Sequence, residues 1–144
     1  MGELYDADVF EWSQHQSSLL RRRAAGELVN EAELDWPNIA EEIDSVGRDQ
    51  LHAVESFLVQ ALAHDLKAEA WPLSGYVAGW RAEARRFRDD AAARYTPSMR
   101  QRLDLAKLYR RALRAIPDQV DGEPSLPAPA TCPVTLDELL AVGE

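Results

Sequence analysis

The sequence predicts an all-α protein, an antiparallel bundle of about four helices with a proline-rich C-terminal strap and a short terminal helix. Three observations predict this class. Apolar residues recur three and four positions apart between Trp36 and Trp71, no segment alternates polar and apolar residues, and five of the eight prolines lie between residues 117 and 133. The apolar spacing marks one side of an α-helix, and the absence of alternation argues against strands. The prolines exclude a helix or strand of any considerable length in the segment that contains them.

The longest predicted helix lies between Pro37 and Pro72. Pro37 fits a first helical turn, where its missing N–H would have no partner, and Pro72 excludes the residue before it from helical geometry. Gly47 interrupts the pattern at a cost of about 1 kcal/mol relative to alanine. Such a helix has about 33 residues and spans roughly 50 Å. It cannot bury its apolar stripe alone, so other segments must cover that stripe, which consists of Ile39, Ile43, Val46, Val54, Phe57, Leu58, Ala61, Leu62 and Leu66.

The residues before this helix predict a first helix and an acidic connector. Asp6 or Asp8 can cap the first helix, and three arginines in its last turn suit the negative end of the helix dipole. Gly26 is expected to end it. In the connector that follows, Leu28 and Leu34 are expected to pack against the bundle. The apolar edge of the first helix consists of Val9, Trp12, Gln16, Leu19 and Leu20.

Two more helices follow the central one. The third is expected over residues 76–91, after a turn that contains proline, serine and glycine. The fourth is expected over residues 97–116, because the Thr96 hydroxyl can cap a helix whose first position is taken by Pro97. Both carry apolar residues at helical spacing.

The C-terminal part completes a single predicted domain over residues 1–144. Residues 1–116 form the bundle, and residues 117–134 form an extended segment over its surface, here named the C-terminal strap. Thr135 and Glu138 then form a capping box, in which each side chain satisfies the other residue's backbone N–H. A short helix is therefore expected over residues 135–142.

Composition limits the classes of function. The lone Cys132 excludes an internal disulfide and a cysteine-rich zinc site. The N-terminal residues are acidic where a signal peptide is basic, and no uncharged stretch is long enough to span a membrane. A cytoplasmic protein without a membrane partner is expected. The formal net charge of −9 argues weakly against nucleic acid as the main partner.

The charge is nevertheless uneven, since residues 80–116 carry 11 basic and 4 acidic side chains. One interpretation is that acidic early helices pack beside basic later ones and that their fields complement each other. The alternative is a basic face on the third and fourth helices that binds nucleic acid. That face would consist of Arg81, Arg85, Arg88, Arg100, Lys107, Arg110, Arg111 and Arg114.

One combination of side chains could bind a divalent metal ion. Asp49 and His52 lie three apart, and Glu11 and His15 lie four apart, so each pair shares one helical face. Helical bundles build metal sites from such pairs on facing helices. These four residues are the candidate ligands of a metal-dependent hydrolase. The competing interpretation is that they form solvated polar edges.

The central helix carries further candidate residues at both ends. His64 shares a helical face with apolar residues and with Trp71. One interpretation is a hydrogen-bonded histidine in the core. The other is a binding groove near His64, Trp71 and Trp80. Near the start, Glu41 and Glu42 suit the positive end of the helix dipole, and Asn38 can bond the exposed backbone of the first turn. The two ends are too far apart to form one site within a single chain, although they could meet in an antiparallel dimer.

The chain resembles the bacterial family called domain of unknown function 29. The resemblance is carried by YDADVFEW, WPNIAEEIDSVGR, ESFLVQALAHDLK, GWRAEARRFR and CPVTLDELL, and it spans nearly the whole chain. It implies an all-helical fold and no established activity. The residues that match the family pattern are Tyr5, Asp6, Trp12, Asn38, Glu41, Glu42, Ile43, Gly47, Ser56, His64, Lys67, Trp80, Arg88, Pro97, Cys132 and Pro133.

These observations favour a protein-interaction or ligand-binding module without catalysis and without a cofactor. The expected partner is a second copy of the chain, giving a dimer, or another protein. A metal-dependent hydrolase is the alternative, and nucleic-acid binding is the weaker one. The expected binding residues are His64, Trp71, Trp80, Asn38, Glu41 and Glu42.

Overall fold

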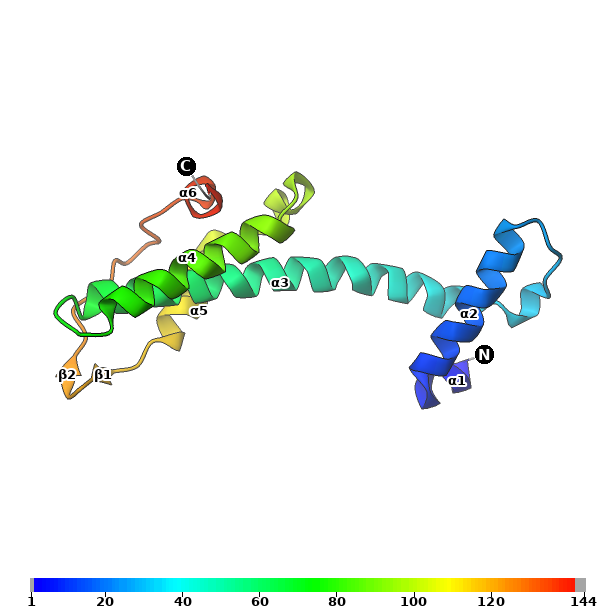
Figure 1. Ribbon diagram of the computed structural model, residues 1–144, viewed down its shortest axis with the longest axis horizontal. Helices are drawn as coiled ribbons and strands as arrows, with labels where there is room; N and C mark the ends of the chain where they lie inside the picture. The colour runs from blue at the N-terminus through cyan, green and yellow to red at the C-terminus, as the bar shows by residue number, and fades with distance from the viewer. Residues whose placement is uncertain (1, 142–144) are drawn as a thin grey trace. The chain divides into compact units, whose positions relative to one another are not determined.

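The computed structural model describes residues 2–141 and shows an all-α fold (Figure 1). The chain divides into two compact units, and the division falls within the longest helix, between Arg48 and Asp49. The prediction of a single domain stays a prediction. The helices and strands, in chain order, are α1 Gly2–Ala7, α2 Val9–Ala24, η1 Glu31–Glu33, α3 Trp36–Ala70, α4 Val77–Arg94, η2 Pro97–Arg102, α5 Leu105–Ala115, β1 Gln119–Val120, β2 Glu123–Pro124 and α6 Leu136–Leu140.

The core of the first unit joins α2, the connector and the start of α3. Trp12, Leu19, Leu34 and Ile39 are its buried members. Asp8 caps α2, because its carboxylate accepts the N–H of Glu11 at 2.9 Å. The packing of Leu34 confirms part of the expectation for the connector. The expectation for Leu28 was wrong, since this side chain is 96% exposed.

The second unit is built on an antiparallel pair of helices, α3 from Asp49 onward and α4. Figure 1 shows α4 lying alongside this part of α3. The rings of Trp71 and Trp80 are in contact, and so are those of His64 and Phe87. Because the lower residue number on α3 pairs with the higher one on α4, the two helices run in opposite directions. Helix α5 and the short α6 add to the same core. The buried core residues are Val54, Leu58, Val59, Leu62, Ala63, Leu66, Ala91, Leu108, Tyr109, Ala112 and Leu139.

The predicted fourth helix is two elements in the structure. Pro97 begins the 3-10 helix η2, and α5 starts only after Leu103, whose backbone is extended (φ −89°, ψ 113°). The break has a local cause, because the Asp104 carboxylate accepts the N–H of Lys107 at 3.2 Å and caps α5. The prediction of one continuous helix over residues 97–116 was therefore wrong.

The C-terminal strap is held to the second unit by hydrogen bonds from side chains and backbone. The Trp71 indole donates to the Glu123 carbonyl at 2.8 Å, and the Tyr109 hydroxyl donates to the Pro129 carbonyl at 2.6 Å. The Leu126 N–H donates to the carbonyl of Ala70 at 3.1 Å. Strands β1 and β2 form a two-stranded hairpin within the strap.

The predicted capping box closes the described part of the chain. Glu138 donates its N–H to the Thr135 hydroxyl at 3.1 Å, and the Thr135 N–H donates to the Glu138 carboxylate at 3.3 Å. The short helix was expected to reach Val142, which lies outside the described residues. No helix among residues 2–141 is long and apolar enough to cross a membrane.

Candidate functional sites

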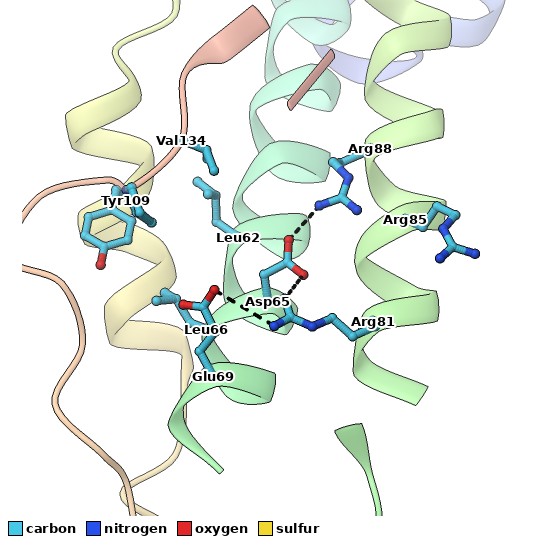
Figure 2. Close-up of a pocket in the computed structure, with 10 residues that line it drawn as sticks. Leu62, Asp65, Leu66, Glu69, Arg81, Arg85, Arg88, Tyr109 and Val134 are labelled. Carbon is cyan, nitrogen blue, oxygen red and sulfur yellow. Dashed lines mark hydrogen bonds and ion pairs between the residues drawn. The ribbon is translucent and has the colours of Figure 1, made fainter. Parts of the chain in front are cut away.

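A pocket of about 240 Å³ lies between α3 and α4 in the second unit (Figure 2). At its centre, the Asp65 carboxylate binds two arginines of α4, with Oδ1 2.8 Å from Arg81 and Oδ2 2.6 Å from Arg88. Glu69 lies one turn further along α3, 3.9 Å from Arg81. Both oxygens of Asp65 are thus used within the chain, and the ion pairs join the two helices.

The remaining cation of this pocket is Arg85. Its side chain is exposed and points away from Asp65 (Figure 2). The apolar part of the lining comes from Leu62, Leu66, Tyr109, Pro133 and Val134. The Tyr109 hydroxyl is turned to the strap, and burial raises the pKa of this phenol above its ordinary value of 10.0. The pocket thus offers a small, mixed surface in which most charges are already paired.

Three of the eight side chains in the basic face predicted for nucleic-acid binding pair with carboxylates of the described chain. Arg81 and Arg88 bind Asp65, and Arg100 pairs with Asp137. Outside that face, Arg86 pairs with Glu83 at 2.6 Å. The hydrogen bond to Asp137 raises the pKa of the Arg100 guanidinium. Part of the positive charge of these helices is therefore complemented within the chain, while nucleic-acid binding through the rest stays a prediction.

His64 lies against α4, and its ring is 5.5 Å from that of Phe87. Its Nδ1 is 2.8 Å from the carbonyl oxygen of Gln60, and because a carbonyl can only accept, Nδ1 is the protonated ring nitrogen and donates a hydrogen bond to it. The side chain is half-buried. The expected hydrogen bond is therefore present, whereas the ring is half-buried at the edge of the core and is not among its buried residues.

Trp71 and Trp80 form an aromatic group with Tyr76 at the α3–α4 turn. The ring centroids of the two tryptophans are 6.2 Å apart, and the Lys67 ammonium lies 5.7 Å from the centre of the Trp80 ring. Trp71 also lines a second, open pocket of about 540 Å³ beside the hairpin. Neither pocket includes His64 or Trp80. The binding role expected of these three residues stays a prediction.

Asn38 belongs to a buried polar network in the first unit. Its side chain donates to Asp35 Oδ2 at 2.8 Å, and the Trp12 indole donates to the same oxygen at 3.0 Å. Gln16 accepts the Asp35 N–H at 2.9 Å. The hydrogen bond from Asn38 is the main reason that the pKa of Asp35 is lowered. Burial opposes this effect, and the Trp12 bond adds to it.

The sequence argument expected Asn38 to bond the backbone of the first helical turn. It did not include the hydrogen bond that the side-chain amide donates to the Asp35 carboxylate. Asp35 itself was missed by the sequence argument. The signal that could have found it is its position immediately before a helix, where aspartate is a preferred cap.

The two glutamates near the start of α3 are also engaged within the first unit. Glu41 pairs with Arg48 at 2.7 Å. Glu42 accepts the hydroxyl of Tyr5, and this hydrogen bond is the main cause of the raised pKa of that phenol. Both contacts give the glutamates a structural role, while the binding role expected of them stays a prediction.

The candidate metal ligands are divided between the units. Glu11 and His15 lie in the first unit, whereas Asp49 and His52 lie in the second. Within residues 2–141, no three histidine, cysteine or acidic side chains are grouped so that they could hold a metal ion. The metal-dependent hydrolase therefore gains no support from the geometry.

The first unit's part of α3 carries an uncovered apolar face. No residue from Ala40 to Arg48 is buried, and Ile43 and Val46 are 68% and 65% exposed. The expectation that these two residues lie in the buried stripe was wrong. Ile39, one turn earlier on the same side, is buried against the core. Within the first unit, the apolar stripe is therefore bare from Ala40 to Arg48.

The chain matches the family model described as domain of unknown function DUF29 over residues 4–142. It belongs to this family. The DUF29 chain is also similar to a crystal structure of an alpha-helical protein of unknown function from Rhodospirillum rubrum, with 27% identity and a TM-score of 0.64. The similarity covers 94% of this chain and 88% of the other. A comparison with curated proteins finds no match. The family and this structure support the helical fold and name no activity.

Proposed function

We propose that this DUF29 protein is a non-catalytic protein-interaction module whose contact surface is the apolar face of α3 in the first unit. The observation that carries the proposal is the exposure of Ile43 and Val46 on a helical stretch with no buried residue. These two residues together with Gly47 form a surface that we name the α3 face. Scattered apolar residues are common on protein surfaces, but these lie side by side on one helical face.

The energetics of a helix support the same proposal. Most helical stability in proteins comes from packing of an apolar face, and a short helix without packing is marginal in water. The stretch from Ala40 to Arg48 has no such packing, and Gly47 adds the entropic cost of glycine. A protein bound to the α3 face would supply the missing contacts.

The titratable groups with shifted pKa values support a structural role for these side chains, in which they stabilise the fold, more than a catalytic role. Asp35, Tyr5 and Tyr109 are each held by a hydrogen bond to another part of the chain. A catalytic pair would bring two such groups together in a pocket with their pKa values pushed apart. Of these three residues, only Tyr109 lines either pocket described above.

A photo-crosslinking experiment tests the proposal. A photoreactive amino acid at Val46 is expected to give an adduct of one defined mass in living cells. The matched control places the same group at Glu41, which is exposed on the opposite side of the helix. The adduct should be absent from position 41 and lost when Ile43→Lys is added. Equal adducts from both positions, or none from position 46, would contradict the proposal.

A stability measurement tests the premise that the chain itself leaves this face bare. In dilute protein, Ile43→Lys should change the free energy of unfolding by less than about 0.5 kcal/mol, as is usual for surface positions. The control is Ile39→Lys, which buries a charge in the core and should destabilise the first unit strongly. If both variants lose similar stability, Ile43 is covered within its own chain and the proposal fails.

A further inference from the structure

We infer that the second pocket, which lies between the α3–α4 turn and the hairpin and is here named the turn pocket, binds a small organic amine. The ligand would carry an ammonium group on an apolar body. Residues 70–75 line one side of the turn pocket, and the hairpin and Leu126 line the other. The site belongs to the second unit and the α3 face to the first, so this inference does not depend on the proposed function.

The two sides of the turn pocket are joined by hydrogen bonds. The Trp71 indole donates to the Glu123 carbonyl at 2.8 Å, and the Leu126 N–H donates to the Ala70 carbonyl at 3.1 Å. Figure 1 shows the hairpin beside the turn that these bonds attach it to. Because the fold itself holds the pocket open, a ligand does not have to order its walls, and less entropy is lost on binding.

The volume and the apolar lining fit a small molecule. The turn pocket encloses about 540 Å³, and pockets for small ligands measure roughly 300–1,000 Å³. Its lining includes the buried Trp71 and two leucines in solvent, Leu73 with 98% and Leu126 with 52% of its surface exposed. A ligand with an apolar body would take surface of both leucines out of water, which favours binding.

The charge of the lining selects a cation. Asp121 and Glu123 are acidic, and no lining residue is basic. Within residues 2–141, neither of these carboxylates has a hydrogen-bond or ion-pair partner. In the other pocket, by contrast, the Asp65 carboxylate is already bound by two arginines. An ammonium group in the turn pocket would supply the partner that Asp121 and Glu123 lack.

The hairpin fixes where these two acids lie. Asp121 and Gly122 have φ values of 52° and 79°, the positive values that a two-residue hairpin turn with the sequence Asp-Gly adopts. Val120 pairs with Glu123 across the hairpin, so their side chains lie on the same side of it. Val120 is half-buried and lines the pocket, which places Glu123 on the pocket side.

An NMR titration of the full chain with 2-phenylethylamine tests the inference. The indole N–H resonance of Trp71 should shift and saturate with a dissociation constant in the millimolar range, as expected for so small a ligand. The indole of Trp36, in the first unit, should not shift. The neutral analogue 2-phenylethanol should bind at least about fivefold more weakly. Absence of a saturable shift, or equal affinity for the amine and the alcohol, would overturn the inference.

Variants of the two acids test the source of the selectivity. Asp121→Asn and Glu123→Gln should each weaken amine binding about threefold and leave alcohol binding unchanged. Both should keep the hairpin, because asparagine also tolerates a positive φ and the bond to Trp71 uses the backbone of Glu123. Asp118→Asn, at an exposed acid of the strap outside the pocket, is the matched control and should change neither affinity. If the double variant keeps its amine affinity, or loses amine and alcohol binding equally, the charge assignment is wrong.

A lysine side chain in a protein segment is the other source of an ammonium group. Nα-acetyl-lysine methylamide carries that group between two peptide bonds and should bind more weakly than 2-phenylethylamine. The reason is that its peptide groups would lose water against a largely apolar lining. Tighter binding of the lysine derivative would show that the pocket takes a protein segment and would overturn the assignment to a small molecule.

Discussion

Replacement of Asp35 is expected to destabilise the first unit more than any exposed substitution in it. Asp35 is only 3% exposed, and its carboxylate holds together α2 and the start of α3. In Asp35→Ala, the buried indole N–H of Trp12 loses its acceptor, and Asn38 loses the partner of its amide. The backbone N–H of Asn38, in the first turn of α3, also loses the carboxylate that caps it.

The magnitude follows from these contacts. A buried donor left without an acceptor costs about 1–3 kcal/mol, and loss of a helix cap costs about 1 kcal/mol. Removal of the carboxylate also removes its own desolvation cost, so we expect a net loss of about 3 kcal/mol. Asp35→Asn should lose only about 1 kcal/mol, because its amide oxygen can still accept both hydrogen bonds that now reach Oδ2.

Urea unfolding followed by NMR provides the assay. The indole N–H resonance of Trp12 reports the first unit directly, and the variant Trp12→Phe assigns it. Asp6→Ala, which truncates an exposed aspartate of the same unit, is the matched control and should change the stability by less than about 0.5 kcal/mol. If Asp35→Ala costs no more than this control, the network does not hold the unit together and the argument is refuted.

The same carboxylate sets a pH dependence. The pKa of Asp35 in the folded protein lies below the ordinary value of 3.8, so the folded state favours the ionised form. Its contribution to stability is complete above this ordinary value and is lost as the pH falls from there through the lower, folded pKa. The difference in stability between the wild type and Asp35→Asn should therefore shrink on acidification below pH 3.8. A constant difference would contradict the assignment.

The remaining predictions concern buried side chains of the second unit, with the exposed Ile43 of the first unit as a comparison. Leu58→Ala, at a side chain with no exposed surface, should lower the free energy of unfolding by about 3 kcal/mol. Ile43→Ala should change it by less than about 0.5 kcal/mol in dilute protein. Equal losses of stability in thermal unfolding would contradict the assigned burial. Tyr109→Phe should cost about 1 kcal/mol and speed proteolysis of the strap, because it removes the hydrogen bond to Pro129. Since burial raises the pKa of Tyr109 above 10.0, wild-type stability should fall as the pH rises above 10.0, and this slope should be reduced in the Phe variant.

Local features of the fold could be predicted from the sequence because their causes are local. The capping box at Thr135 needs only two residues three positions apart, and the start of α3 needs only the fixed geometry of Pro37. The prolines of the strap likewise exclude a helix whatever surrounds them. The break before α5 was missed because helical periodicity continues through it, while the cap at Asp104 decides where the helix begins.

The candidate sites could be predicted less well. The sequence placed His64 correctly on an apolar face, but its hydrogen bond to Gln60 depends on a side-chain rotamer. Asp35 was missed because its partner Trp12 lies 23 residues away and the contact is tertiary. The two arginines on Asp65 were predicted only as part of a basic face, because the sequence does not show which carboxylate packs opposite them.

The sequence by itself determined that this chain is helical, where its longest helix begins and ends, and that the helix carries one apolar stripe. Only the tertiary structure decided which part of the stripe is buried. Periodicity marks a side of the helix that can be covered, but burial needs another segment at that height along the axis. The core covers Ile39 in the first unit and Val54 in the second, and it leaves Ile43 and Val46 in solvent because no described segment packs on them.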